Sequence, residues 1–358
     1  MSTSGISLYL AHLDVAAAAC AQAQRLGATE AFASLHMPED DPATFAAELR
    51  DVSALAHDHG LRLTVDISQN SLPALGLTPE TADGLKAYGV DAIRVDFGLP
   101  DEAIAAISRV LPLQLNASTI GPDWLAALLK AGLRTDALTA SHNFYPRRHT
   151  GISRELLAAR NEMWHAHGIP VSAFAPGDGV LRAPVHAGLP TLEAHRAWHP
   201  LAAALDLAAL GCDTVHIGDP LLADRTVTQW RAWNEDAEID LTVHLRPGTP
   251  PPVLAHLTSS DPDRERTDPA EELVRLENSR PALRAEPTPA HDGPPEPRPR
   301  GTLTLGNDEL PRYRGELSLT RTDLPPDPTV NVLGTVPPAE LPLLDLIGPG
   351  TPVRLTPA

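Results

Sequence analysis

This 358-residue chain is organised around the stretch Ser141-His142-Asn143-Phe144-Tyr145-Pro146-Arg147-Arg148-His149-Thr150-Gly151. The stretch places imidazoles, an amide, a phenol and two guanidinium groups directly after the apolar residues 137–140. A helix pattern opened by Ser153 follows it. Polar groups at a strand-to-helix junction are typical of the catalytic face of a (β/α)₈ barrel. Arginines at such a junction suit a fixed dianion such as a phosphate. For this segment alone, the simpler interpretation is a loop whose polar groups form hydrogen bonds with one another.

The same strand-then-helix pattern occurs eight times between residue 4 and about residue 235. The expected strands lie at residues 6–10, 30–36, 61–68, 92–98, 113–118, 137–141, 171–175 and 214–220. Eight such units at short spacing predict an α/β fold, a (β/α)₈ TIM barrel over residues 1–235. An open doubly wound sheet is the competing fold, but no glycine-rich phosphate loop follows the first strand. Within the helical region 191–210, Pro200 is expected either to begin a new helix or to kink the existing one.

The pattern of apolar and turn-forming residues changes at about residue 236. Short alternating runs at residues 241–245, 301–305, 315–319 and 330–334 are separated by prolines and glycines, which predicts a small, mostly β domain over residues 236–358, in the form of a small barrel. One helix is expected at residues 269–278, and the proline-rich residues 287–299 are expected to form an exposed loop.

Composition limits the partners of the chain. A formal net charge of −18 argues against nucleic acid or an anionic membrane, whereas local arginines can still bind a small anion. The only cysteines, Cys20 and Cys212, indicate buried thiols of a reduced compartment. The sequence shows neither a signal peptide nor a spanning helix, so we expect a cytoplasmic protein. The oligomeric state is left open.

Side chains at the carboxyl ends of barrel strands converge on one pocket, and here they are unusually polar. The candidate substrate-binding residues are Tyr9, Ser34, His36, Arg94, Asn116, His142, Asn143, Tyr145, Arg147, Asp178 and Asp219. The candidate catalytic residues are Asp66 and Asp96, which end neighbouring strands and could form the acid and nucleophile pair of a glycosidase.

Other roles are open for the same residues. Asp96 could simply pair with Arg94, which shares its face of the strand, and Asp66 could cap the following loop. The glycines around Asp178 could carry it to the pocket or form an ordinary turn, and Asp219 has the same two interpretations. A catalytic metal is the rival use for His36, Asp66, Asp96, His142 and His216, but no metal-binding spacing appears.

Several motifs together resemble a known family. They are residues 34–41 (SLHMPEDD), 65–68 (VDIS), 115–119 (LNAST), 142–147 (HNFYPR) with Thr150-Gly151, 176–179 (PGDG), 188–193 (GLPTLE), 217–220 (IGDP) and 312–317 (RYRGEL). The chain resembles the MupG-type 6-phospho-N-acetylmuramidases along nearly its whole length.

The resemblance implies a TIM barrel followed by a cyclophilin-like β domain. It also implies a glycosidase without a cofactor that hydrolyses a phosphorylated amino-sugar disaccharide, 6-phospho-N-acetylmuramic acid linked to N-acetylglucosamine, in peptidoglycan recycling. On this interpretation Arg147, which Arg148 and His142 can assist, binds the 6-phosphate and the lactyl carboxylate. Asp66 and Asp96 then flank the scissile bond. Asn116 and Asn143 bind sugar hydroxyls or the acetamido group.

Two other functions fit the residues. A sugar-phosphate aldolase or isomerase of the Schiff-base type would need a lysine at a strand end, but the only lysines, Lys86 and Lys130, fall in expected helices, which leaves a metal-dependent version. A non-catalytic sugar-phosphate-binding protein is the third possibility.

Overall fold

The computed structural model describes residues 3–10, 13–34 and 45–358. These residues form two compact units, Met1–Val227 and Thr228–Ala358. The division falls within helix α8 (Asp224–Asp236), and the predicted domain boundary lies at the end of the same helix.

The first unit is a closed parallel barrel, as predicted. Its strands are β1 (Thr3–Leu8), β2 (Glu30–Ser34), β3 (Arg62–Ser68), β4 (Ala92–Phe97), β5 (Leu113–Asn116), β6 (Leu138–Ser141), β7 (Val171–Ala175) and β8 (Thr214–Ile217). Each strand pairs with the next along the chain, and β1 also pairs with β8, which closes the ring. The register aligns Ser34 with Asp66 and Asp66 with Arg94, so these side chains emerge at one level of the barrel.

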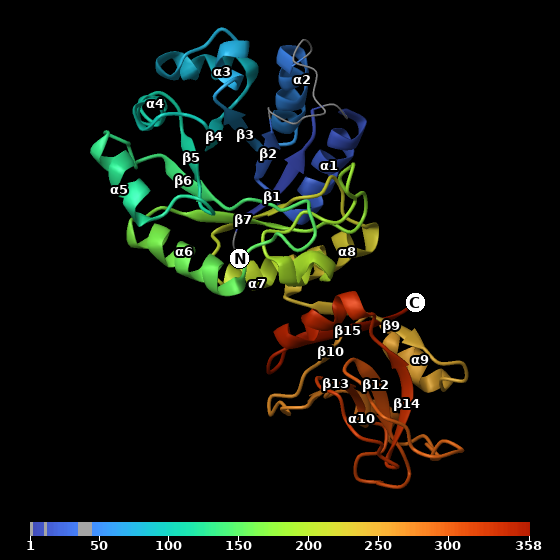
Figure 1. Cartoon of the computed structure of the whole chain (residues 1–358). Helices are drawn as coiled ribbons and strands as arrows, with labels where there is room; N and C mark the ends of the chain where they lie inside the picture. The colour runs from blue at the N-terminus through green and yellow to red at the C-terminus, as the bar shows by residue number, and fades with distance from the viewer. Residues whose placement is uncertain (1–2, 11–12, 35–44) are drawn as a thin grey trace. The chain divides into compact units, whose positions relative to one another are not determined.

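Helices surround the strands (Figure 1). They are α1 (Leu13–Leu26), α2 (Phe45–Asp58), α3 (Ser71–Ala74), η1 (Pro79–Tyr88), α4 (Asp101–Ile107), α5 (Pro122–Lys130), α6 (Arg154–Ala166), η2 (Glu193–Ala197), α7 (Pro200–Ala209) and α8, where η marks a 3₁₀ helix. Ser153 caps α6 by accepting a hydrogen bond from the Leu156 N–H at 3.2 Å. Pro200 begins α7 after η2 has ended, which is one of the two expected outcomes, because proline lacks the N–H that a helix interior needs.

Alanine-rich helices pack closely on the strands. In α1 the buried residues recur at helical spacing and include Ala16, Ala19 and Ala23. Inside the barrel the rings of Phe32, Phe144 and Phe174 meet edge to face at centroid distances of 5.2–6.4 Å. The three rings therefore pack against one another, two of them from strands β2 and β7 and the third from the segment that follows β6.

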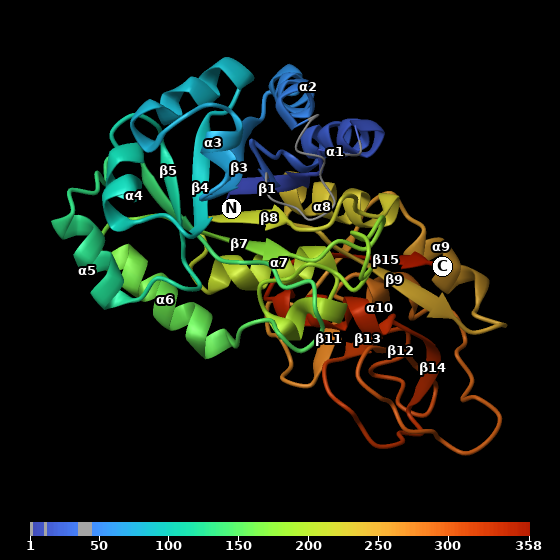
Figure 2. The same ribbon diagram turned by 45° about the horizontal axis from the view of Figure 1, so that its top comes forward.

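The second unit is a seven-stranded sheet with the order β10-β15-β9-β14-β12-β13-β11. Its elements are β9 (Ile239–Leu245), α9 (Pro251–Leu257), β10 (Asp263–Arg264), β11 (Leu273–Arg275), α10 (Ser279–Leu283), β12 (Thr302–Gly306), β13 (Leu317–Thr320), β14 (Val330–Thr335), η3 (Pro338–Leu346) and β15 (Pro352–Pro357). All pairs are antiparallel except β15 with β9, which lie side by side in Figure 2.

Two expectations for this unit were wrong. The sheet has edge strands β10 and β11, so it is not the small closed barrel that was predicted. The helix expected at residues 269–278 is replaced by β11, and a helix begins only at Ser279. Val274 in β11 is fully buried and pairs with Leu319 of β13, so strand pairing overrides the local helix pattern.

Candidate active site

The centre of the site is the guanidinium of Arg94, which is 3% exposed. Its Nη1 donates to Asp66 Oδ2 at 2.9 Å and to Asp96 Oδ1 at 3.3 Å, and its Nη2 donates to Asn143 Oδ1. The two carboxylates therefore share one cation, whose single positive charge offsets part of their combined negative charge. Asp96 is the more accessible, with a side chain 25% exposed against 9% for Asp66.

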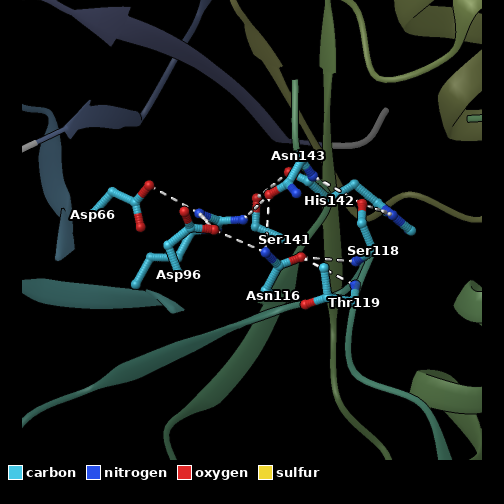
Figure 3. Close-up of polar contacts among 9 residues, drawn as sticks. Asp66, Asp96, Asn116, Ser118, Thr119, Ser141, His142 and Asn143 are labelled. Carbon is cyan, nitrogen blue, oxygen red and sulfur yellow. Dashed lines mark hydrogen bonds and ion pairs between the residues drawn. The ribbon is translucent and has the colours of Figure 1, made fainter. Parts of the chain in front are cut away.

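Two amides complete this cluster (Figure 3). Asn116 Nδ2 donates to Asp96 Oδ1 at 2.9 Å and to Asn143 Oδ1 at 3.0 Å. Asn116 Oδ1 accepts the backbone N–H groups of Ser118 and Thr119 at 3.0 and 3.3 Å, which turns the chain out of β5. The structure thus brings together five of the predicted residues from the ends of β3, β4, β5 and β6.

His142 is a different case, because its ring is fully buried. Its Nε2 lies 2.9 Å from Asn161 Oδ1 on α6, and its Nδ1 lies 3.1 Å from Ser118 Oγ. Burial, aided by the nearby Arg94 and Arg160, lowers the pKa of His142 to about 4, although the hydrogen bond with Asn161 opposes the shift. The ring is therefore neutral at physiological pH and lies behind the cluster, facing α6.

The two predicted aspartates of the later loops bind backbone. Asp219 is 1% exposed, and its carboxylate accepts the N–H groups of Gly177, Arg182 and Leu189 at 2.8, 3.1 and 2.9 Å. Burial raises the pKa of Asp219, and these three hydrogen bonds oppose that shift. Asp178 is exposed, and it accepts the N–H of Ala223 at 2.8 Å just before α8. Both residues shape the loops after β7 and β8.

Tyr9 lies at the end of β1, and its hydroxyl donates to the carbonyl of Gly218 beyond the end of β8. Burial raises the pKa of Tyr9, so the phenol keeps its proton. The guanidinium of Arg182 lies over the Tyr9 ring at 5.6 Å from the centroid. Since Asp219 binds its backbone N–H, Arg182 is a cation held at the catalytic end of the barrel.

An ion pair that the sequence analysis missed holds the loop after β6, within residues 141–151. Arg196 donates from Nε and Nη2 to the two oxygens of Glu193 at 2.6 Å each, and from Nη2 to the carbonyls of Tyr145 and Arg147 at 3.0 and 3.3 Å. The same carboxylate accepts the N–H groups of His149 and Gly151 at 2.8 Å. Arg196 lowers the pKa of Glu193 to about 2.

The remaining predicted residues are more peripheral. Tyr145 is partly exposed, and Arg147 lies exposed on the loop that Arg196 holds. Ser34 is partly exposed at the end of β2, next to Asp66 in the register. His36 lies outside the described residues. No hydrogen bond or ion pair within the described ranges joins the Arg147 guanidinium to the Arg94 cluster.

His216 and the two lysines, which the rival functions would use, lie away from the Arg94 cluster. His216 is 2% exposed and packs on Phe174 at a centroid distance of 5.4 Å, within the barrel core, and burial lowers its pKa. Lys86 and Lys130 lie in η1 and α5 as predicted, not at strand ends. In the part of the chain that the structure describes, no three His, Cys, Asp or Glu side chains are grouped as metal ligands would be.

Three residues of this region escaped the sequence analysis: Asn161, Arg182 and Arg196. Asn161 and Arg182 lie 19 and 37 residues from His142 and Asp219, the partners that explain them. Arg196 pairs with Glu193 only three residues away, but the carbonyls of Tyr145 and Arg147 that it also binds lie 51 and 49 residues away. A buried asparagine inside the helical pattern of α6 was the one available signal for Asn161, since asparagine is a poor helix former.

Both units of the chain match models of one protein family. The family model described as 6-phospho-N-acetylmuramidase, N-terminal, matches residues 4–232, and the model described as 6-phospho-N-acetylmuramidase, C-terminal, matches residues 240–356. No curated protein matches the chain. None of the helices in the described ranges is long and apolar enough to cross a membrane.

Two solved structures match the chain over almost all of its length. A conserved protein of unknown function from a locus in Enterococcus faecalis is 31% identical, with a TM-score of 0.85, over 99% of this chain and 96% of that one. An uncharacterized B. cereus protein is 25% identical, with a TM-score of 0.70, over 99% of both chains. Because the two family models cover the barrel and the β unit in turn, the chain belongs to the 6-phospho-N-acetylmuramidase family.

Proposed function

We propose that the protein is a glycosidase that cleaves the disaccharide of 6-phospho-N-acetylmuramic acid and N-acetylglucosamine during peptidoglycan recycling in the cytoplasm. One observation carries the proposal: two carboxylates from neighbouring strands flank a single guanidinium at the catalytic end of a barrel of this family. Glycoside hydrolysis needs such a pair of carboxylates. The β unit, which we take to be cyclophilin-like, matches the C-terminal model of the same family.

The geometry favours one stereochemical course. Asp66 Oδ2 and Asp96 Oδ1 lie 2.9 and 3.3 Å from the same nitrogen, so their separation cannot exceed the sum of these distances. This limit on the two nearest oxygens lies closer to the roughly 5–5.5 Å between the carboxyl groups of retaining glycosidases than to most of the range of roughly 6.5–9.5 Å of inverting ones. We therefore propose a retaining reaction, in which the two carboxyl groups divide the roles of nucleophile and general acid.

The neighbouring amides and cations suit the rest of the substrate. Asn116 and Asn143 present amide groups beside Asp96, where a sugar hydroxyl or an acetamido group can bind. Two arginines are candidates for the anionic groups: Arg147 on the loop after β6, and Arg182 on the loop after β7. The second lies where TIM barrels often bind phosphate, near the loops that follow the seventh and eighth strands.

The test compares two disaccharides that differ only in the 6-phosphate. We expect the protein to release 6-phospho-N-acetylmuramic acid and N-acetylglucosamine from the phosphorylated one, and to cleave the unphosphorylated one with a kcat/KM at least about 100-fold lower, since a charged contact is lost. Proton NMR during the reaction should show the product with the anomeric configuration of the substrate. Cleavage abolished by a chelator would favour the metal-dependent alternative, and binding without turnover would favour the sugar-phosphate-binding protein.

A further inference from the structure

We propose that Asn161, His142 and Ser118 form a hydrogen-bond relay in which the donor and the acceptor of each bond are fixed. The relay holds Asn143 in place and, through Asn143, orients Arg94 between the two carboxylates. These three are then positioning residues, because each acts through Asn143 and not on the substrate. This inference rests on the proposed function for its consequence in catalysis, but the relay itself is a property of the folded protein.

The direction of the relay begins at Asn161, which is 2% exposed on the inner side of α6. Its Nδ2 faces two acceptors, the carbonyl of Leu210 at 2.9 Å and the sulfur of Cys212 at 3.4 Å. A carbonyl oxygen can only accept, so the amide nitrogen must point at Leu210. Asn161 Oδ1 therefore faces His142, and His142 Nε2 must carry the proton between them.

A neutral imidazole with a proton on Nε2 has a bare Nδ1, which accepts a hydrogen bond. The group 3.1 Å from Nδ1 is the Ser118 hydroxyl, so this hydroxyl must donate to the ring. Its oxygen is then left to accept, and it receives the backbone N–H of Asn143 at 3.0 Å. Each donor of the relay thus meets an acceptor, and one arrangement of protons satisfies all of them.

The relay ends in the catalytic cluster. The Asn143 carbonyl accepts from the Thr191 hydroxyl at 2.9 Å, so the backbone of this residue is held on both sides. Its side-chain Oδ1 accepts from Arg94 Nη2 and from Asn116 Nδ2. The same guanidinium contacts Asp96 through its other nitrogen, Nη1, and Asn116 Nδ2 contacts Asp96 as well, so a displaced Asn143 would move the cation and the amide that set the position of the carboxylate.

The environment of the ring keeps this arrangement. Burial lowers the pKa of His142 to about 4, and the charges of Arg94 and Arg160 act in the same direction. A protonated ring would present N–H groups on both nitrogens, and Ser118 would then have to accept from the ring as well as from Asn143. The hydroxyl would lose its donor role, and the relay would lose its single direction.

The first test uses Ser118→Ala in the full chain, with Ser118→Thr as the conservative variant and Ser108→Ala as the matched control. Ser108 also accepts a backbone N–H, that of Arg134 at 3.0 Å, but it lies in the α4 region away from the site. We expect Ser118→Ala to lower kcat on the phosphorylated disaccharide by about 10- to 100-fold, because Asn143 loses its backbone anchor and no longer holds Arg94 and Asn116 in place, with KM changed less than about threefold. Ser118→Thr should recover most of the loss, and Ser108→Ala should show none.

A double variant separates positioning from a direct role. If Ser118 acts through Asn143, Ser118→Ala combined with Asn143→Ala should be no slower than Asn143→Ala alone. Losses that multiply, or a change in KM that matches the change in kcat, would overturn the relay.

The second test does not depend on turnover. In ¹⁵N-histidine NMR of the wild type, the His142 signals, assigned by their loss in His142→Gln, should show a neutral ring with its proton on Nε2. Asn161→Leu should remove this preference. A proton on Nδ1 in the wild type, or a charged ring at neutral pH, would refute the relay even if the disaccharide is cleaved, whereas a correct tautomer with no cleavage would refute the proposed function alone.

Discussion

Replacing Arg94 by methionine tests the central ion cluster through stability. Methionine keeps much of the apolar stem of the side chain but removes the guanidinium that contacts Asp66, Asp96 and Asn143. The Asp66 side chain is 9% exposed, so its charge is left in the protein interior without this cation. Breaking a buried ion pair from one side costs about 3–5 kcal/mol. At roughly 2–4 °C per kcal/mol for a unit of this size, Tm should fall by about 6–20 °C.

The assay is differential scanning calorimetry of the Arg94→Met protein against the wild type over a range of pH. The deficit in Tm should shrink as the pH is lowered, because protonation removes the negative charge that has lost this cation. Combining Arg94→Met with Asp66→Asn should recover part of the stability, since a neutral amide replaces the carboxylate that has lost this cation. An unchanged Tm in the single variant, or a double variant less stable than the single one, would refute the argument that Arg94 compensates a buried charge.

Three further predictions concern other charged groups. Burial raises the pKa of Glu265, in the β unit, from 4.5 to about 7, so between these pH values the folded state keeps a proton that the unfolded state has lost. The free energy of unfolding should therefore fall by up to about 3 kcal/mol as the pH rises from 4.5 to 7, and urea titrations should show that Glu265→Gln removes this pH dependence. Glu193→Gln should lower the free energy of unfolding by about 3 kcal/mol in the same assay. Arg196 loses its anionic partner, and one of the two oxygens that accept the N–H groups of His149 and Gly151 becomes an NH₂ group, which cannot accept. Arg147→Ala and Arg182→Ala should show which arginine binds the phosphate: replacing that arginine should raise KM for the phosphorylated disaccharide by about 10- to 100-fold and leave KM for the unphosphorylated one unchanged. Equal effects of a substitution on both disaccharides would exclude that arginine as the phosphate ligand.

The barrel and the meeting of the two carboxylates could be predicted because both follow from simple periodicity. Eight strand-then-helix units close a ring, and residues two apart on one strand share a face. Asp66 and Asp96, at the ends of neighbouring strands, therefore had to emerge near each other. The role of Arg94 was predicted only in part: its pairing with Asp96 was one of the alternatives, but its contact with Asp66 depends on the register between β3 and β4, which no local pattern specifies.

The roles of His142 and Asp219 could not be found in this way. His142 and Asn143 are adjacent, so they point in opposite directions, but the short strand β6 carries no alternation that indicates which of them faces the barrel axis. Asp219 follows a strand end as a catalytic residue would, yet its carboxylate binds N–H groups 30 to 42 residues away in sequence. Such loop contacts are decided by the tertiary structure, and the same is true of the pairing that makes β11 a strand.

The most direct test of the account measures turnover of the phosphorylated disaccharide by Asp66→Asn and Asp96→Asn. The matched control is Asp136→Asn, which alters an exposed aspartate that pairs only locally, with Arg134 at 2.6 Å. If the two carboxylates around Arg94 perform the reaction, each variant should lose activity by a factor of roughly 10²–10⁴ or more, while the control keeps the wild-type rate. Near-complete turnover by both Asp66→Asn and Asp96→Asn would contradict the account.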